Sequence, residues 1–119
     1  MKLIVTERET RALRAYLREH PVRLTSRVAT VEVARAVARH RAPALGLLRT
    51  AFAGVGLIEL NPEIAAAAGS LAPETLRTLD AIHVASALSL SGDLAAFVSY
   101  DARQTKAAAA AGLRVASPA

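Results

Sequence analysis

Three acidic residues stand where carboxylates can act together on a metal ion. Glu32 lies in the first turns of an expected helix, Asp80 in the first turn of an Ala-rich segment, and Asp101 where an expected strand gives way to a helix. In an open parallel sheet, the carboxyl ends of strands and the adjoining helix starts collect along one edge. Acids gathered there repel one another, and Mg²⁺ or Mn²⁺ relieves the repulsion because these hard cations favour carboxylate oxygens.

Each acid also has an ordinary structural interpretation. Asp101 fits the N-cap of a helix, Asp80 fits a first-turn acid that complements the helix dipole, and Glu32 fits a surface position. Ser99, two residues before Asp101, shares its strand face and is a candidate to assist it. His83 follows Asp80 by three residues and fits either a packed histidine or a metal or phosphate contact. The pattern alone leaves both interpretations open.

Helices and short strands alternate along the chain, as judged by hydrophobic periodicity. Helices are expected at about residues 7–19, 28–40, 44–52, 62–69, 79–88 and 102–111, and strands at about 22–25, 57–60, 95–99 and 113–116. Ser26, Asn61 and Asp101 are expected N-caps, and Gly112 is expected to end a helix. The alternation implies parallel strands in a layered α/β sandwich, and without a linker or repeat we expect one domain over residues 1–119.

The helix expected at 28–40 has an apolar face. Val28, Val31 and Val37 are expected to point inward, together with either Ala34 or Ala38.

Composition excludes several classes of protein. The chain has 119 residues, 53% of them hydrophobic, a formal net charge of +5 and no cysteine, so disulfide scaffolds, zinc ribbons and cysteine nucleophiles are excluded. Its longest apolar runs, such as 64–68 and 107–111, fall far short of the ~20 residues that span a bilayer. The first residues contain no apolar stretch of signal-peptide length. We therefore expect a cytoplasmic protein with no membrane partner.

The positive charge is concentrated in the first half. Residues 1–49 carry eleven Lys and Arg against four Glu, a net charge of +7, whereas residues 50–119 have a net charge of −2. Arg11, Arg14 and Arg18 recur at helical spacing, and Arg39 belongs to a second basic group. These arginines are candidate contacts for an RNA backbone, and they equally fit a solvated helix face.

Three segments, taken together and in order, resemble the acidic motifs of one known family. They are residues 26–36 (SRVATVEVARA), 79–87 (LDAIHVASA) and 97–101 (FVSYD) with the Ala-rich stretch that follows. Over nearly the whole chain they resemble the PIN-domain family and, within it, the VapC-type ribonuclease toxins of bacterial toxin–antitoxin pairs.

The resemblance implies a fold, an activity and a site. The fold is a three-layer α/β/α sandwich with a mostly parallel sheet, and the activity is endoribonuclease cleavage of structured RNA, of the tRNA or rRNA class, by metal-activated water. Glu32, Asp80 and Asp101 are the implied catalytic acids and ligands of Mg²⁺ or Mn²⁺, and Ser99 is the small hydroxylated residue of the fourth motif. A VapB-like antitoxin is the implied protein partner.

The chain departs from the family pattern at its beginning. Residues 1–7 resemble the part that follows the family's first strand and its aspartate, so we expect an N-terminally truncated domain, explained if the gene start was assigned inside the gene. Neighbouring strands would then have unpaired edges, which favours a homodimer. Loss of one acid is expected to lower catalysis by at least about 10²-fold. Two alternatives stay open: an impaired PIN remnant that binds RNA or antitoxin without cleavage, and an α/β interaction domain without a nucleic-acid role.

Overall fold

The computed structural model describes residues 10–39, 49–50, 52–90 and 92–119. The chain forms two compact units, residues 1–57 with 118–119 and residues 58–117. Residues 1–7, on which the expectation of a truncated domain rests, and most of the helix expected at 44–52 lie outside the described residues. The interpretation of residues 1–119 as a single domain stays a prediction.

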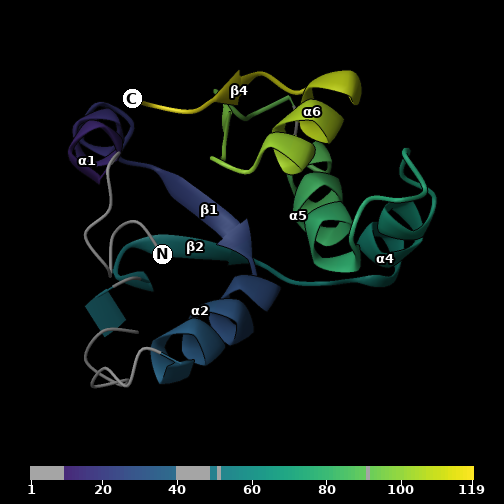
Figure 1. Cartoon of the computed structure of the whole chain (residues 1–119), viewed down its shortest axis with the longest axis horizontal. Helices are drawn as coiled ribbons and strands as arrows, with labels where there is room; N and C mark the ends of the chain where they lie inside the picture. The colour runs from purple at the N-terminus through teal and green to yellow at the C-terminus, as the bar shows by residue number, and fades with distance from the viewer. Residues whose placement is uncertain (1–9, 40–48, 51, 91) are drawn as a thin grey trace. The chain divides into compact units, whose positions relative to one another are not determined.

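The first unit alternates helices and strands as expected. Its elements are α1 (Thr10–Glu19), β1 (Arg23–Ser26), α2 (Val28–Arg39) and β2 (Val55–Ile58), and the last residue of β2 is the first of the second unit. The strands β1 and β2 form a two-stranded sheet, and their arrows point the same way in Figure 1. The Ser26 Oγ accepts a hydrogen bond from the Val28 N–H, the first N–H of α2, at 3.3 Å. Ser26 ends β1 and lies one residue before the position that directly precedes the helix, so it bonds the helix start from one residue earlier than an N-cap would.

The buried face of α2 differs from the expected one. Ala29, Ala36 and Val37 are buried, whereas Val31 is 60% exposed, so its predicted inward position is wrong. At 100° per residue the three buried residues lie on one side of the helix, and Val31 lies on the opposite side. Two of these three buried residues are alanines, whereas the prediction had placed mainly valines on the buried face.

The second unit is built around a central helix. It contains α4 (Pro62–Gly69), α5 (Thr78–Leu88), β3 (Phe97–Val98), α6 (Ala102–Ala110) and β4 (Val115–Ala116). Figure 1 shows α5 between α4 and α6, and it contacts both of them. The core of this unit is formed by small and medium side chains from α5, α6 and the segment after α6: Val84, Ala87, Ala108 and Leu113.

The two strands of the second unit are parallel, as expected for strands joined through a helix. Phe97 lies opposite Val115, and Val98 lies opposite Ala116. The Phe97 N–H donates to the Arg114 carbonyl at 2.7 Å. Parallel strands joined through α6, together with the alternation of elements, confirm the predicted α/β class.

Gly112 ends α6 in the way that its position in the sequence predicts. Its φ of +101° is the left-handed conformation that favours glycine. The Gly112 N–H donates to the Ala109 carbonyl and the Leu113 N–H to the Ala108 carbonyl, both at 3.0 Å, which is the Schellman pattern of a helix C-terminus. This turn directs Leu113 back into the core and starts the chain toward β4.

Among the described residues, none of the helices combines the length and the apolar character that crossing a bilayer requires.

The N-cap of α4 gives a direct test of the fold. The Asn61 Oδ1 accepts a hydrogen bond from the N–H of the buried Ile64 at 2.7 Å. We expect Asn61→Ala to lower the free energy of unfolding by about 1 kcal/mol, because one helix N–H loses its partner. Urea denaturation followed by circular dichroism measures the change. Asn61→Asp keeps the acceptor and serves as the matched control, and equal stability of the alanine variant and the unmodified chain would contradict the assignment.

Candidate functional site

Asp80 and Asp101 are brought together by the start of α5 and the start of α6. Asp80 lies in the first turn of α5, and Asp101 is the N-cap of α6. One side chain connects the two acids. The Arg77 Nε donates to the Asp80 Oδ2 at 2.9 Å, and the Arg77 Nη2 donates to the Asp101 Oδ2 at 3.0 Å. Two separate nitrogens of one guanidinium therefore hold one oxygen of each carboxylate.

The other oxygen of each aspartate is held by α6. The Asp101 Oδ1 accepts from the backbone N–H groups of Arg103 and Gln104, at 2.9 and 3.0 Å. The Asp80 Oδ1 accepts from the Gln104 Nε2 at 3.2 Å. Each carboxylate is thus anchored through Oδ1, and the two Oδ2 atoms face the same positive group.

The three side chains of this cluster differ in exposure. Asp80 is buried, with 8% of its surface exposed, and a buried carboxylate needs hydrogen-bond partners or a counter-charge. The side chain of Asp101 is 39% exposed and that of Arg77 is 60% exposed. The acids are therefore anchored at the edge of the unit, and the guanidinium reaches them from the solvent side.

The surroundings of Asp101 stabilise its charged form. Its pKa lies below the ordinary value of 3.8, chiefly because the Gln104 N–H donates to the carboxylate. Burial opposes this and is the second-largest effect, but the Arg103 N–H and the charges of Arg77 and Arg103 lower the pKa further. The pKa of Arg77 is raised, chiefly by its hydrogen bond to Asp80 and by the charges of both acids. Asp101 and Arg77 are consequently both charged at neutral pH.

Ser99 fixes the backbone in front of Asp101. Its Oγ accepts a hydrogen bond from the Asp101 N–H at 3.1 Å. Its own N–H donates to the Ala116 carbonyl, and its carbonyl accepts from the Ser117 hydroxyl at 2.6 Å. The serine is therefore tied to the chain that continues from β4, and through this tie it orients the start of α6.

The structure places the predicted site residues in both units. Asp80, Asp101 and Ser99 lie together in the second unit, whereas the half-buried Glu32 belongs to α2 in the first, and a site shared with Glu32 stays a prediction. Within residues 10–39 and the other described ranges, no three Asp, Glu or His side chains form a group suited to a metal. Exposed positions on α1 and at the end of α2 hold the candidate RNA contacts Arg11, Arg14, Arg18 and Arg39.

Arg77 and Gln104 were not identified as site residues from the sequence. Arg77 precedes Asp80 by three residues, a spacing at which side chains on one helical turn can meet. This spacing in the sequence could therefore have predicted the contact between Arg77 and Asp80. Gln104 carried no such signal, because its contact with Asp80 joins residues 24 apart in sequence and exists only once α5 and α6 pack.

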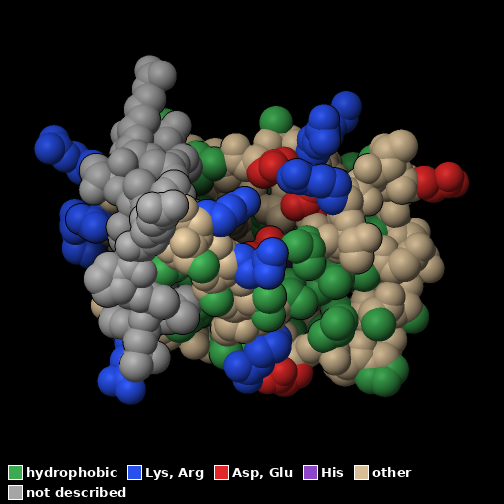
Figure 2. All heavy atoms as spheres, turned by 60° about the horizontal axis from the view of Figure 1, so that its bottom comes forward, with side chains coloured by type: hydrophobic (Ala, Val, Ile, Leu, Met, Phe, Trp, Pro, Cys, Tyr) green, Lys and Arg blue, Asp and Glu red, His purple; other side chains and the backbone are tan. Residues whose placement is uncertain are grey.

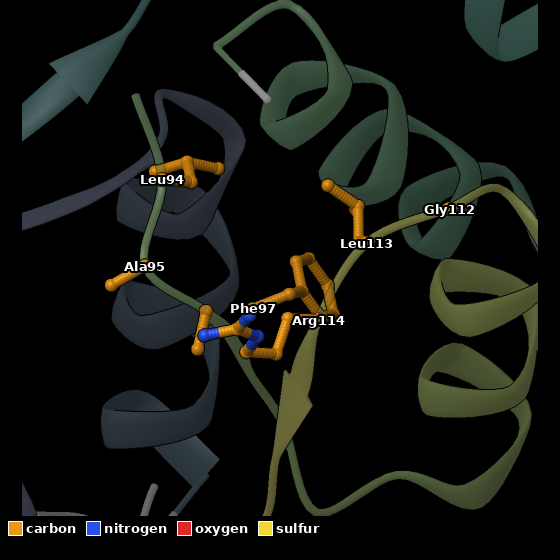
Figure 3. A pocket seen from close by; sticks show the side chains of 7 residues that line it. Leu94, Ala95, Phe97, Gly112, Leu113 and Arg114 are labelled. Carbon is orange, nitrogen blue, oxygen red and sulfur yellow. The ribbon is translucent and has the colours of Figure 1, made fainter. Parts of the chain in front are cut away.

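The pocket beside β3 and β4 is a different site from the pair of Asp80 and Asp101. On the face shown in Figure 2, acidic side chains lie directly beside Lys or Arg side chains. A cavity of about 220 Å³ in the second unit contains no carboxylate (Figure 3). Its lining consists of Leu94, Ala95, Ala96, Phe97, Gly112, Leu113 and Arg114. The pocket is therefore separate from the aspartate pair.

The aspartate pair fits a hard divalent cation. Its donors are carboxylate oxygens, the ligand type that Mg²⁺ and Mn²⁺ prefer. The two Oδ2 atoms already meet a single cationic group, so one positive charge can be shared between them. Partial exposure of Asp101 leaves room for water, which Mg²⁺ retains when it binds proteins.

The fold and the site define a class: α/β proteins whose carboxylates gather at helix starts beside a parallel strand pair. The PIN domain family matches residues 1–110, and the chain belongs to this family. It is 41% identical over 118 residues to ribonuclease VapC46 of Mycobacterium tuberculosis, covering 99% of this chain and 91% of that protein. Ribonucleases VapC47 and VapC35 of the same species are 35% and 33% identical over 122 residues, each covered to 90%. No solved structure matches the chain.

The lowered pKa of Asp101 predicts how stability depends on pH. Because the folded pKa is below the ordinary value, ionised Asp101 stabilises the fold above that value, and the contribution is lost as pH falls through the folded pKa. Asp101→Asn keeps a capping oxygen but carries no charge. We expect the unfolding free energy of the unmodified chain to fall more steeply than that of the variant between about pH 5 and pH 2. Urea denaturation at a series of pH values measures this, and parallel curves would contradict it.

Proposed function

We propose that this chain is a divalent-metal-dependent endoribonuclease that acts as the toxin of a toxin–antitoxin pair. The observation that carries the proposal is the pair of Asp80 and Asp101 carboxylates, each anchored through one oxygen and turned with the other toward a shared cation. Membership of the PIN domain family and the ribonuclease names of the relatives support it. These names also favour cleavage over a remnant that only binds RNA.

Asp80 and Asp101 would hold Mg²⁺ or Mn²⁺, and Glu32 is proposed as a further ligand or as the group that positions a water. When bound, the ion supplies an activated water and neutralises charge that develops on the phosphate. Gln104 holds the Asp80 carboxylate in place, and the first turn of α6 holds that of Asp101. Ser99 orients the residue that begins this turn. Attack by water leaves the ribose 2′-OH unused, so the products carry 5′-phosphate and 3′-hydroxyl ends.

Structured RNA of the tRNA or rRNA class is the proposed substrate. The exposed arginines of α1, with Arg39 of α2, would contact its phosphate backbone, because clustered Arg side chains bind phosphates through charge. A VapB-like antitoxin, a homodimeric state and the cytoplasm as the site of action complete the proposal, and all three rest on the family resemblance and the sequence.

Cleavage by variants of the aspartate pair tests the proposed activity. We expect Asp80→Asn and Asp101→Asn each to lower the rate of cleavage of mixed tRNA and rRNA by at least about 10²-fold, because each removes a positioned charged group. The assay is run with Mg²⁺ or Mn²⁺ and read on gels, with end-group analysis of the products.

Asp93→Asn is the matched control, because it removes the charge of an exposed aspartate in the same unit. Addition of EDTA is expected to stop cleavage by the unmodified chain. Cleavage that persists in EDTA, or products that end in 2′,3′-cyclic phosphate, would refute the proposed reaction.

The salt dependence of RNA binding tests the basic face of α1. Arg14→Gln combined with Arg18→Gln is expected to weaken binding and to lower the slope of log affinity against log salt by about 1 per arginine removed. Fluorescence anisotropy with labelled RNA measures the slope. The control is Lys106→Gln with Arg114→Gln, two exposed basic residues of the second unit. If both double variants lost RNA affinity and salt slope equally, the effect would come from total charge and not from a binding face on α1.

A further inference from the structure

We propose that Arg77 is a built-in competitor of the divalent cation: its guanidinium holds Asp80 and Asp101 together in the metal-free chain and must release them before one ion can bind both. This inference rests on the proposed metal-dependent function and concerns the regulation of the same site. It assigns Arg77 a positioning and competing role, not contact with the reacting atoms.

The two oxygens of each carboxylate have different partners. Both Oδ1 atoms are engaged by α6, through Gln104 and the helix N–H groups. The Oδ2 atoms are the ones directed toward a shared cation, and Arg77 uses both of them. A metal ion held by both carboxylates would therefore compete with the guanidinium for them.

The position of Arg77 allows this release without unfolding. Arg77 is the N-cap of α5, its side chain makes no capping bond, and its backbone carbonyl is held separately by the Ala81 N–H at 2.9 Å. The side chain is 60% exposed, so it can move into water while the backbone and the first turn of the helix stay in place. The guanidinium can thus move away, whereas the Asp101 Oδ1 is held by backbone N–H groups of α6 and the Asp80 Oδ1 by the side-chain amide of Gln104.

The strength of the competition follows from exposure and charge. The pair of Arg77 with Asp101 joins two partly exposed side chains and is screened by water and salt, whereas the pair with Asp80 joins the exposed guanidinium to a buried carboxylate and is screened from one side only. A divalent cation carries twice the charge and forms direct bonds to carboxylate oxygens. The guanidinium should therefore shift the concentration of metal that fills the site rather than close the site altogether.

Calorimetric titration of the metal-free 119-residue chain with Mn²⁺ tests the inference without an activity readout. We expect Arg77→Gln to bind Mn²⁺ about three- to tenfold more tightly than the unmodified chain, because two ion pairs no longer compete. Arg103→Gln is the matched control. It removes a neighbouring positive charge that acts on Asp101 and keeps both bonds made by Arg77. Arg77→Lys keeps the charge but has a single nitrogen for two acids, so its affinity should fall between the two.

The outcomes separate this inference from the proposed function. Tighter binding by Arg77→Gln than by Arg103→Gln supports the competition. Equal affinities of Arg77→Gln and the unmodified chain, with binding still lost in Asp80→Asn and Asp101→Asn, overturn the inference and leave the metal site standing. Mn²⁺ binding that survives both aspartate substitutions overturns the two together.

Folding of the variants is checked by the melting temperature without metal. Arg77→Gln should melt lower than the unmodified chain at low salt, because the acids lose their shared counter-charge. Mn²⁺ should raise its melting temperature more than that of the unmodified chain, and an equal rise in both would speak against the competition.

Discussion

Small side chains at the contact between α5 and α6 determine how the site is built. Ala87 and Ala108 meet with Val84 and Leu113 in the core of the second unit, and side chains of this size let two helices approach closely. The approach brings the first turns of both helices within reach of one guanidinium and one glutamine side chain. The acid pair is thus a product of core packing, although its members lie at the edge of the unit.

Structural and functional interpretations of the acids do not exclude each other. Asp101 caps α6 through Oδ1 and meets Arg77 through Oδ2, so a single carboxylate stabilises a helix start and also pairs with a guanidinium. Asp80 is likewise held through one oxygen and paired through the other. The cap lowers the pKa of Asp101 and so keeps the carboxylate in its charged form.

Local signals in the sequence predicted much of the second unit. Asn61 and Asp101 as caps, Gly112 as a helix end and the parallel strands around α6 follow from short-range chemistry, and the structure agrees. Val31 was misplaced, because alanines rather than the largest apolar residues form the buried face of α2. The contact of Arg77 with Asp80 has a local i,i+3 spacing, whereas the bonds of Arg77 to Asp101 and of Gln104 to Asp80 depend on tertiary packing, which a pattern along the chain does not encode.

The shared guanidinium has a consequence for how substitutions combine. Arg77 bonds to both aspartates, so removing one acid leaves it free to interact more strongly with the other. Groups that share a partner have non-additive energies. The change in unfolding free energy on substituting both acids therefore differs from the sum of the changes for the two single substitutions. That difference is a coupling energy, and it is transmitted through Arg77, a residue that neither substitution alters.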